Sequence, residues 1–223
     1  MKIYADGADL KSILGLNANP LVEGFTTNPT LLRKDGVTDY EGFAKAVLEE
    51  VAKPVSFEVF ADEFDEMERQ ARIISSWAEN VYVKIPITNT RKESSIPLIQ
   101  KLYKEWIKLN ITALMSTRQV VELSKILDRE TPTVVSVFAG RIADTGLDPI
   151  PLMRRAKIQL KPLKNVELLW ASPREVLNIY QARTSRADIV TCPPEMIEKY
   201  QKLAGKDLEE FSLETVQMFY NDG

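Results

Sequence analysis

Eight short β-rich runs recur along the 223-residue chain, and each is followed by a segment with helical spacing or polar turn residues. The runs end in polar residues and cover 2–6, 24–28, 55–60, 81–87, 110–114, 133–138, 166–172 and 187–192. Strands that alternate with helices through a whole chain pair in parallel by right-handed crossovers. Eight such units close into a (β/α)8 TIM barrel, which is the predicted fold of the α/β class. An open doubly wound sheet is the alternative.

The nucleotide-binding form of the open sheet is disfavoured, because no G-x-G-x-x-G follows the first run and no P-loop motif occurs. A barrel of this length is on the small side, so substrate contacts should come from strand ends and short loops. We expect one domain over 1–223. Roughly 195–223 would form a C-terminal helical tail, whose apolar residues need a surface on this barrel or on a neighbouring subunit.

The chain contains no histidine, and this count removes several kinds of chemistry. Ser-His-Asp and Cys-His nucleophile systems, histidine-ligated zinc and imidazole acid–base catalysis all need that ring. The single cysteine, Cys192, excludes an intramolecular disulfide and fits a reducing compartment. Any chemistry must therefore run on carboxylates, lysines, hydroxyls and water.

Charge and hydropathy argue against two kinds of partner. The net charge of −3 lacks the basic surplus that a nucleic-acid backbone requires. The longest apolar runs fall far short of the roughly 20 residues that span a bilayer, and the N-terminus has no apolar signal-peptide core. We expect a cytoplasmic protein with no nucleic-acid and no membrane partner.

Polar residues cluster at the ends of the predicted strands, where the active site of a barrel of this type lies. They are Asp6, Asn28, Glu58, Lys84, Asn110, Thr112, Ser136, Arg141, Ser172 and Arg174. Period-two alternation puts Tyr82 and Lys84 on one face of their strand, and Asn110, Thr112 and Leu114 on one face of the next. If those faces point inward, a lysine lies inside a ring of acids, amides and hydroxyls.

A lysine inside a barrel is costly to keep charged, so the neutral amine becomes available as a nucleophile towards carbonyls. The Schiff base that forms is an electron sink. It allows a neighbouring C–C bond to break while a carboxylate takes the hydroxyl proton. This chemistry needs no histidine, metal or cofactor. The alternative for Lys84 alone is a structural ion pair with Asp6 or Glu58.

Six motifs, in register over nearly the whole chain, closely resemble the short transaldolases and their fructose-6-phosphate aldolase relatives. They are GFTTNPTLL (24–32), VYVKIPIT (81–88), NITALMS (110–116), VSVFAGRIAD (135–144), WASPRE (170–175) and ADIVTCP (187–193). The resemblance implies that Lys84 is the Schiff-base lysine and Asp6 the acid/base group for the C4 hydroxyl. It also implies that Glu58 works through a water held by Thr112.

The same resemblance implies a substrate site and an assembly. Asn28, Asn110 and Ser136 match groups that bind the hydroxyls of a dihydroxyacetone unit, and Arg141, Ser172 and Arg174 match a phosphate site. The implied partners are sugar phosphates and further copies of the chain, in a ring-like pentamer or decamer with the C-terminal helix packed across subunits. The resemblance implies that no cofactor is used.

Two positions distinguish the branches of the family. The aldolases typically have Gln at Glu58 and Tyr at Phe138, whereas transaldolases have Glu and Phe, as here. We therefore expect a transaldolase of the pentose phosphate pathway. Such an enzyme would move a dihydroxyacetone unit from sedoheptulose 7-phosphate or fructose 6-phosphate to an aldose phosphate. A lyase that releases dihydroxyacetone, a transaldolase for a variant sugar and a non-catalytic binding or assembly barrel are the alternatives.

Three features outside the matched site residues carry their own expectations. Trp170 stands where the family has a small residue. It is expected to share the face of Ser172, and either to fill the barrel interior or to narrow the pocket. The loop 89–95 departs from the family by lacking its glycine. Asp144 and Asp148 flank Gly146, and loop capping is the favoured role for both.

Overall fold

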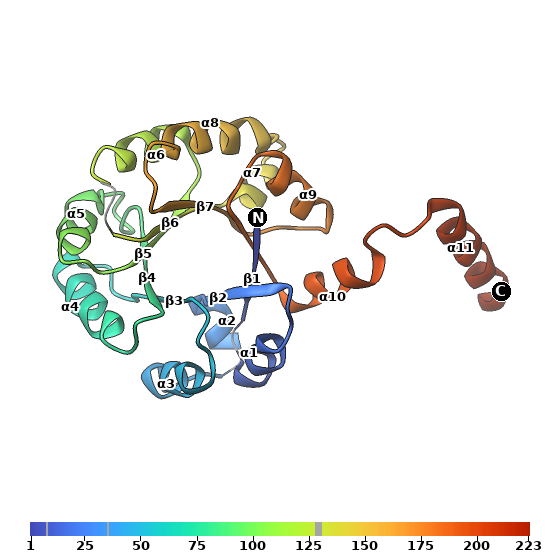
Figure 1. Cartoon of the computed structure of the whole chain (residues 1–223), viewed down its shortest axis with the longest axis horizontal. Helices are drawn as coiled ribbons and strands as arrows, with labels where there is room; N and C mark the ends of the chain where they lie inside the picture. Colours follow the sequence, from blue (N-terminus) through green and yellow to red (C-terminus); the bar gives the residue numbers. More distant parts are fainter. Residues whose placement is uncertain (8, 35, 128–130) are drawn as a thin grey trace.

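The computed structural model describes residues 1–7, 9–34, 36–127 and 131–223. Within these residues, eight parallel strands close into a barrel in sequence order, and the last strand pairs with the first (Figure 1). The strands are β1 (Lys2–Asp6), β2 (Val22–Thr26), β3 (Val55–Glu58), β4 (Val81–Pro86), β5 (Leu109–Leu114), β6 (Thr133–Val137), β7 (Val166–Trp170) and β8 (Ile189–Cys192). The predicted (β/α)8 barrel is confirmed, and the open sheet is excluded.

Helices surround the barrel as an outer layer, except for the last one, which projects away from it (Figure 1). They are α1 (Leu10–Asn17), α2 (Pro29–Lys34), α3 (Tyr40–Glu50), α4 (Phe64–Ser75), α5 (Ile96–Lys104), α6 (Thr117–Ser124), α7 (Ala139–Asp144), α8 (Ile150–Leu160), α9 (Leu177–Thr184), α10 (Pro194–Leu203) and α11 (Leu208–Asp222). Helix α4 shows why they pack there. Its buried residues Met67, Ala71 and Ile74 recur at helical spacing and form one apolar stripe.

Two apolar layers hold the fold together. The larger one lies between strands and helices and contains the outward residues of each strand, such as Phe25 and Ile85. A smaller cluster lies inside the barrel and consists of Tyr4, Val134, Leu169, Ala171 and Ile189. On β1, Tyr4 precedes Asp6 by two residues, so both point to the same side of the strand. The inner apolar cluster thus underlies the polar strand ends.

The expectation for Trp170 is wrong. Its side chain is fully buried in the outer layer, and its neighbours Leu169 and Ala171 face inward instead. Ser172 follows the end of β7 with φ 62°, in the left-handed region, so strict alternation stops before it. Trp170 therefore neither fills the barrel interior nor narrows the pocket.

Alternation also fails at the end of β5. Ala113 has φ 64°, and the pairing of β5 with β6 shifts register between Ile111 and Leu114. The prediction that Leu114 shares the face of Asn110 and Thr112 is therefore wrong. Leu114 packs in the outer layer instead.

The tail continues as α10 and then α11, which projects away from the barrel and ends in the C-terminus (Figure 1). Its apolar residues are exposed, and Tyr220 reaches 86%. They include Leu208, Phe211, Leu213, Val216, Met218 and Phe219. In the described part of the chain, no helix combines the length and the apolar character needed to cross a membrane.

Candidate active site

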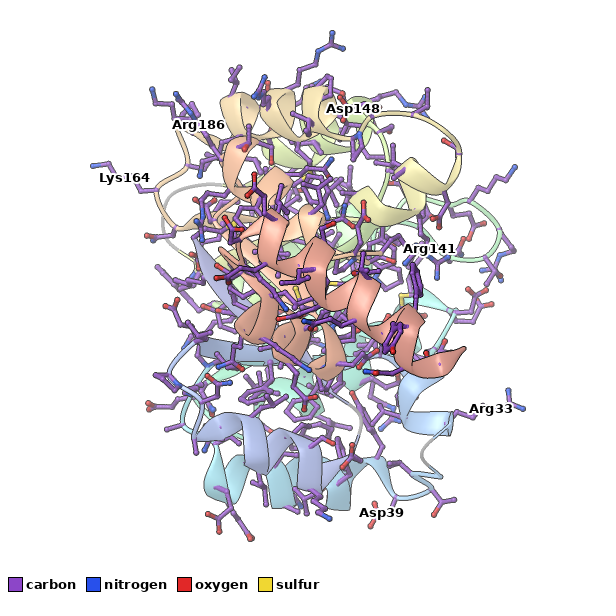
Figure 2. All side chains as sticks on the ribbon, turned by 90° about the vertical axis from the view of Figure 1, so that its right-hand side faces the viewer. Arg33, Asp39, Arg141, Asp148, Lys164 and Arg186 are labelled. Atoms are coloured by element: carbon purple, nitrogen blue, oxygen red, sulfur yellow. The ribbon has the colours of Figure 1, made fainter. Side chains whose placement is uncertain are left out.

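A pocket of about 520 Å³ lies at the carboxyl ends of the strands. Figure 2 shows the barrel from the side. Arg141, which follows β6, lies on the right-hand side of this view, and Lys164 and Arg186, which precede β7 and β8, lie on the left. The pocket is lined by all eleven residues that the sequence assigned to the site: Asp6, Asn28, Glu58, Lys84, Asn110, Thr112, Ser136, Phe138, Arg141, Ser172 and Arg174.

Lys84 lies at the centre of the polar part of this pocket, with 7% of its surface exposed. Its Nζ donates a hydrogen bond to the carbonyl oxygen of Thr27 at 2.8 Å. Nζ also lies 3.1 Å from Oε2 of Glu58, an ion pair without the alignment of a hydrogen bond. Glu58 and Lys84 are register partners on β3 and β4, so the sheet itself places the two charges side by side.

Burial raises the pKa of the Glu58 carboxyl above its usual value, and the nearby Lys84 only partly offsets this. Burial likewise raises the pKa of Asp6, again against the opposing effect of Lys84. Asp6 accepts hydrogen bonds from Oγ1 of Thr26 at 2.8 Å and from Nδ2 of Asn28 at 3.1 Å. Two carboxyl groups with a raised affinity for protons therefore flank one amine.

A chain of neutral hydrogen bonds lies beside Lys84, whose register partner on β5 is Asn110. Oγ of Ser136 donates to Oδ1 of Asn110 at 2.6 Å, and Nδ2 of Asn110 donates to Oγ of Ser56 at 2.9 Å. These bonds fix the orientation of the amide in the pocket. Among the described atoms, the buried hydroxyl of Thr112 has no hydrogen-bond partner, so it is free to bind a water or a substrate atom.

The rim near β6 and β7 is cationic. The guanidinium of Arg141 lies over the ring of Phe138, 5.4 Å from its centroid. Nη1 of Arg174 donates to Oγ of Ser172 at 2.9 Å, and its Nε donates to Oδ1 of Asp144 at 2.9 Å. Arg141 reaches the pocket from α7 and Arg174 from the segment after β7, and two guanidinium groups suit recognition of a phosphate.

Asp144 is placed differently from the prediction. It pairs with Arg174 instead of capping its loop, and this arginine lowers the pKa of its carboxyl. Asp148, by contrast, does accept the backbone N–H of Ile150 at 2.9 Å, as a capping residue would. The pairing of Asp144 joins loops that are 30 residues apart, and no local pattern signals it.

Gly140, in α7, allows this helix to contact the segment after β7. A Cβ built at this position would lie 1.5 Å from the carbonyl oxygen of Ser172, and its N–H donates to the carbonyl of Ala171 at 3.3 Å. Only a residue without a side chain fits so close to a neighbouring backbone. Gly140 therefore sets the position of Ser172 relative to Arg141.

Further residues contribute to the site and were missed by sequence reasoning; one is Thr26, which lines the pocket and donates to Asp6. Thr191 on β8 lies 2.6 Å from Oγ1 of Thr26, and it must be the donor because Thr26 gives its proton to Asp6. The hydroxyl of Tyr40, at the start of α3, accepts the backbone N–H of Glu58 at 2.8 Å. Inward alternation along the last strand could have indicated Thr191, but no spacing points to Tyr40.

Fold and pocket together define a class: a (β/α)8-barrel protein whose site holds one buried amine between carboxylates at the strand ends. The sequence matches the family model Transaldolase/Fructose-6-phosphate aldolase over residues 3–222. The chain belongs to this family, as the six motifs had indicated.

The relatives agree with this assignment. The chain is 34% identical to a probable transaldolase of Brucella ovis over 214 residues, which cover 95% of this chain and 94% of the relative. It is 34% identical to probable transaldolase 2 of Listeria monocytogenes over 217 residues, with the same coverage of each chain.

Solved structures show the fold alone. A mandelate oxidase variant superposes with a TM-score of 0.58 at 12% identity, over 86% of this chain. A flavocytochrome b2 variant superposes with a TM-score of 0.60 at 12% identity, over 87% of this chain. The chain spans only 64% and 57% of those two proteins, so they support the barrel and nothing about its chemistry.

Proposed function

We propose that this protein is a transaldolase that works through a Schiff base on Lys84. The observation that carries the proposal is the buried amine of Lys84 in a pocket with Asp6 and Glu58, in a chain that has no histidine. The structural ion-pair alternative explains the contact with Glu58, but it does not explain why amides, hydroxyls and two arginines face the same pocket.

In the proposed reaction, the neutral amine attacks the C2 carbonyl of a ketose phosphate, and loss of water from the carbinolamine gives a protonated imine. Asp6 takes the proton of the C4 hydroxyl, the C3–C4 bond breaks, and its electron pair moves into the imine to form an enamine. With fructose 6-phosphate as the donor, glyceraldehyde 3-phosphate leaves. The enamine then attacks the aldehyde of an acceptor aldose phosphate, Asp6 returns the proton, and hydrolysis frees Lys84.

Glu58 and Thr112 suit the dehydration step. The raised pKa of Glu58 allows this carboxyl to carry a proton that it can give to the departing water. The free hydroxyl of Thr112 supplies a hydrogen-bond partner for a water on the same side of the pocket. Asn28, Asn110 and Ser136 would hold the hydroxyls of the retained dihydroxyacetone unit.

The cationic rim would bind the substrate phosphate. Arg141, Ser172 and Arg174 line the pocket and offer guanidinium and hydroxyl donors to a phosphate group. In the free protein Asp144 occupies one edge of Arg174, so a phosphate would have to share or displace this carboxylate.

The family includes lyases that release dihydroxyacetone, and the same pocket could serve that reaction. We favour transfer because Phe138 has no hydroxyl to position a water that would protonate the enamine, and because Glu58 is an acid rather than an amide. The two activities separate in one assay, which compares release of dihydroxyacetone from fructose 6-phosphate with and without erythrose 4-phosphate. Rapid release without the acceptor would contradict the transferase proposal.

Trapping with borohydride tests the mechanism. A ketose phosphate or dihydroxyacetone with borohydride should leave a reduced adduct on Lys84, seen by mass spectrometry of the intact protein and of its peptides. Lys84→Ala should give no adduct. If the wild-type protein forms no adduct, the Schiff-base mechanism fails, and the non-catalytic binding or assembly barrel becomes the better account.

We further propose that copies of this chain assemble into a ring-like homo-oligomer in the cytoplasm, as part of the pentose phosphate pathway. The exposed apolar side of α11 supports assembly, because a row that includes Phe211, Val216 and Phe219 is costly to leave in water. Size-exclusion chromatography with light scattering tests this. A monomer at micromolar concentration, unchanged by deletion of 206–223, would contradict it.

A further inference from the structure

The hydrogen-bond ladder between β2 and β3 opens beside Lys84. The backbone N–H of Thr27 still donates to the carbonyl of Ser56 at 3.1 Å. In a regular parallel ladder, the carbonyl of Thr27 would next accept the N–H of Glu58. It accepts Nζ of Lys84 at 2.8 Å instead, and the N–H of Glu58 donates to the hydroxyl of Tyr40 at 2.8 Å.

The Tyr40 hydroxyl joins both sides of this opening. It accepts the backbone N–H of Glu58 on β3 at 2.8 Å, and it lies near the side chain of Thr27 beyond the end of β2. Oγ1 of Thr27 donates its own proton to the carbonyl of Ser56 at 2.9 Å, which ties this side chain to β3. The Tyr40 hydroxyl thus replaces the Thr27 carbonyl as the acceptor for the N–H of Glu58.

The ring of Tyr40 is held by aromatic packing, which aims the hydroxyl. Its centroid lies 6.1 Å from that of Phe57, 5.8 Å from that of Trp77 and 4.5 Å from that of Phe60. The helix that carries it is capped just before it, because Oδ1 of Asp39 accepts the N–H of Gly42 at 2.9 Å. These contacts involve the ring and the backbone, and a phenylalanine would keep them.

We propose that Tyr40 is a positioning residue for the Schiff-base lysine, an inference that rests on the proposed function. By capping the N–H of Glu58, it keeps the carbonyl of Thr27 free to hold the amine of Lys84 next to the Glu58 carboxylate. The same carbonyl then accepts the remaining N–H of the protonated imine. Without the hydroxyl, the N–H of Glu58 competes with Lys84 for the Thr27 carbonyl, and the amine loses its fixed place.

Tyr40→Phe tests the proposal, with Tyr103→Phe as a matched control, because Tyr103 is buried in α5 and does not line the pocket. We expect Tyr40→Phe to form the borohydride-trapped adduct with dihydroxyacetone roughly ten- to hundredfold more slowly, since an ångström of displacement has costs of this size. The kcat for transfer should fall to the same extent, while KM for fructose 6-phosphate changes little, because the arginines are untouched. Tyr103→Phe should behave as the wild type in all three measurements.

The outcomes separate this inference from the proposed function. If the wild type forms no adduct, the proposed function fails. If the wild type forms the adduct and Tyr40→Phe forms it at the same rate, the role of Tyr40 is overturned and the Schiff-base mechanism stands. Should Tyr40→Phe not fold by circular dichroism, Thr27→Val decides. It keeps the Tyr40 ring and removes the Thr27 hydroxyl that lies beside the Tyr40 hydroxyl and ties Thr27 to β3, and an unchanged trapping rate in that variant would refute the role.

Discussion

Substitution of Gly140 by alanine should impair the use of phosphorylated substrates, because it displaces the rim of the pocket. The reactivity of the buried amine of Lys84 should change little. Gly140 lies in α7, and a Cβ at this position would be 1.5 Å from the carbonyl oxygen of Ser172. The obstacle is backbone, so no side-chain rotation can relieve the overlap. The φ angle at Gly140 is not positive, and the effect is therefore one of space and not of backbone strain.

The geometry sets the size of the effect. Non-bonded carbon and oxygen atoms rest roughly 3.3–3.6 Å apart, so α7 and the segment that contains Ser172 must separate by about 2 Å. Overpacking of this kind costs about 1–3 kcal/mol of unfolding free energy. A displacement of 1 Å at a site can cost about 100-fold in rate, and we expect at least this loss in kcat/KM for a phosphorylated donor.

The assay pairs this variant with Gly15→Ala. Gly15 lies in α1, and a Cβ there would meet no atom within 4 Å, so alanine should stabilise that helix by roughly 0.5–1 kcal/mol. Urea unfolding gives the stability change, and steady-state kinetics with fructose 6-phosphate give kcat/KM. Trapping of Lys84 with unphosphorylated dihydroxyacetone should stay within a few-fold of wild type. A Gly140→Ala protein with wild-type kcat/KM for the phosphorylated donor would refute the argument.

Three further predictions address the amine, the phosphate site and the buried acid. Lys84→Ala should abolish turnover and leave the circular dichroism spectrum unchanged; activity within tenfold of wild type would contradict its role. Arg174→Ala should raise KM for phosphorylated substrates more than for free dihydroxyacetone, and equal effects would move the phosphate site elsewhere. Because burial raises the pKa of Asp6, the native state binds more protons than the unfolded chain above about pH 4, so stability falls as pH rises into the native titration. In urea titrations from about pH 4 to pH 7, the free energy of unfolding of Asp6→Asn should fall less with rising pH than that of the wild type. Parallel plots of unfolding free energy against pH for the two proteins would show that Asp6 does not contribute.

The accuracy of sequence reasoning followed the regularity of the backbone. Asp6 and Glu58 were expected at the ends of their strands, and alternation put Lys84 on one face of its strand; all three line the pocket in the structure. Alternation failed where a residue with positive φ interrupts the strand geometry. Ala113 turns Leu114 outward, and the left-handed Ser172 lines the pocket although Trp170 faces the helices.

Contacts between distant segments were also beyond the reach of sequence patterns. Tyr40 and Glu58 are 18 residues apart, and Asp144 and Arg174 are 30 apart. A tyrosine at the start of a helix and an acid at the end of another look like ordinary surface or core residues. Only the closure of the barrel brings their polar atoms to within 3 Å of the groups they hold.

The sequence by itself determined the barrel, the family and eleven of the residues that line the pocket. Strand and helix periodicities are local properties, and the ends of parallel strands must meet at one face. The tertiary structure decided how those residues are held. It leaves the carbonyl of Thr27 without the N–H of Glu58, it places the Tyr40 hydroxyl to accept that N–H, and it brings Gly140 against Ser172. These contacts depend on the distances between segments that are far apart in the sequence. The packing of the whole barrel sets those distances to within a fraction of an ångström.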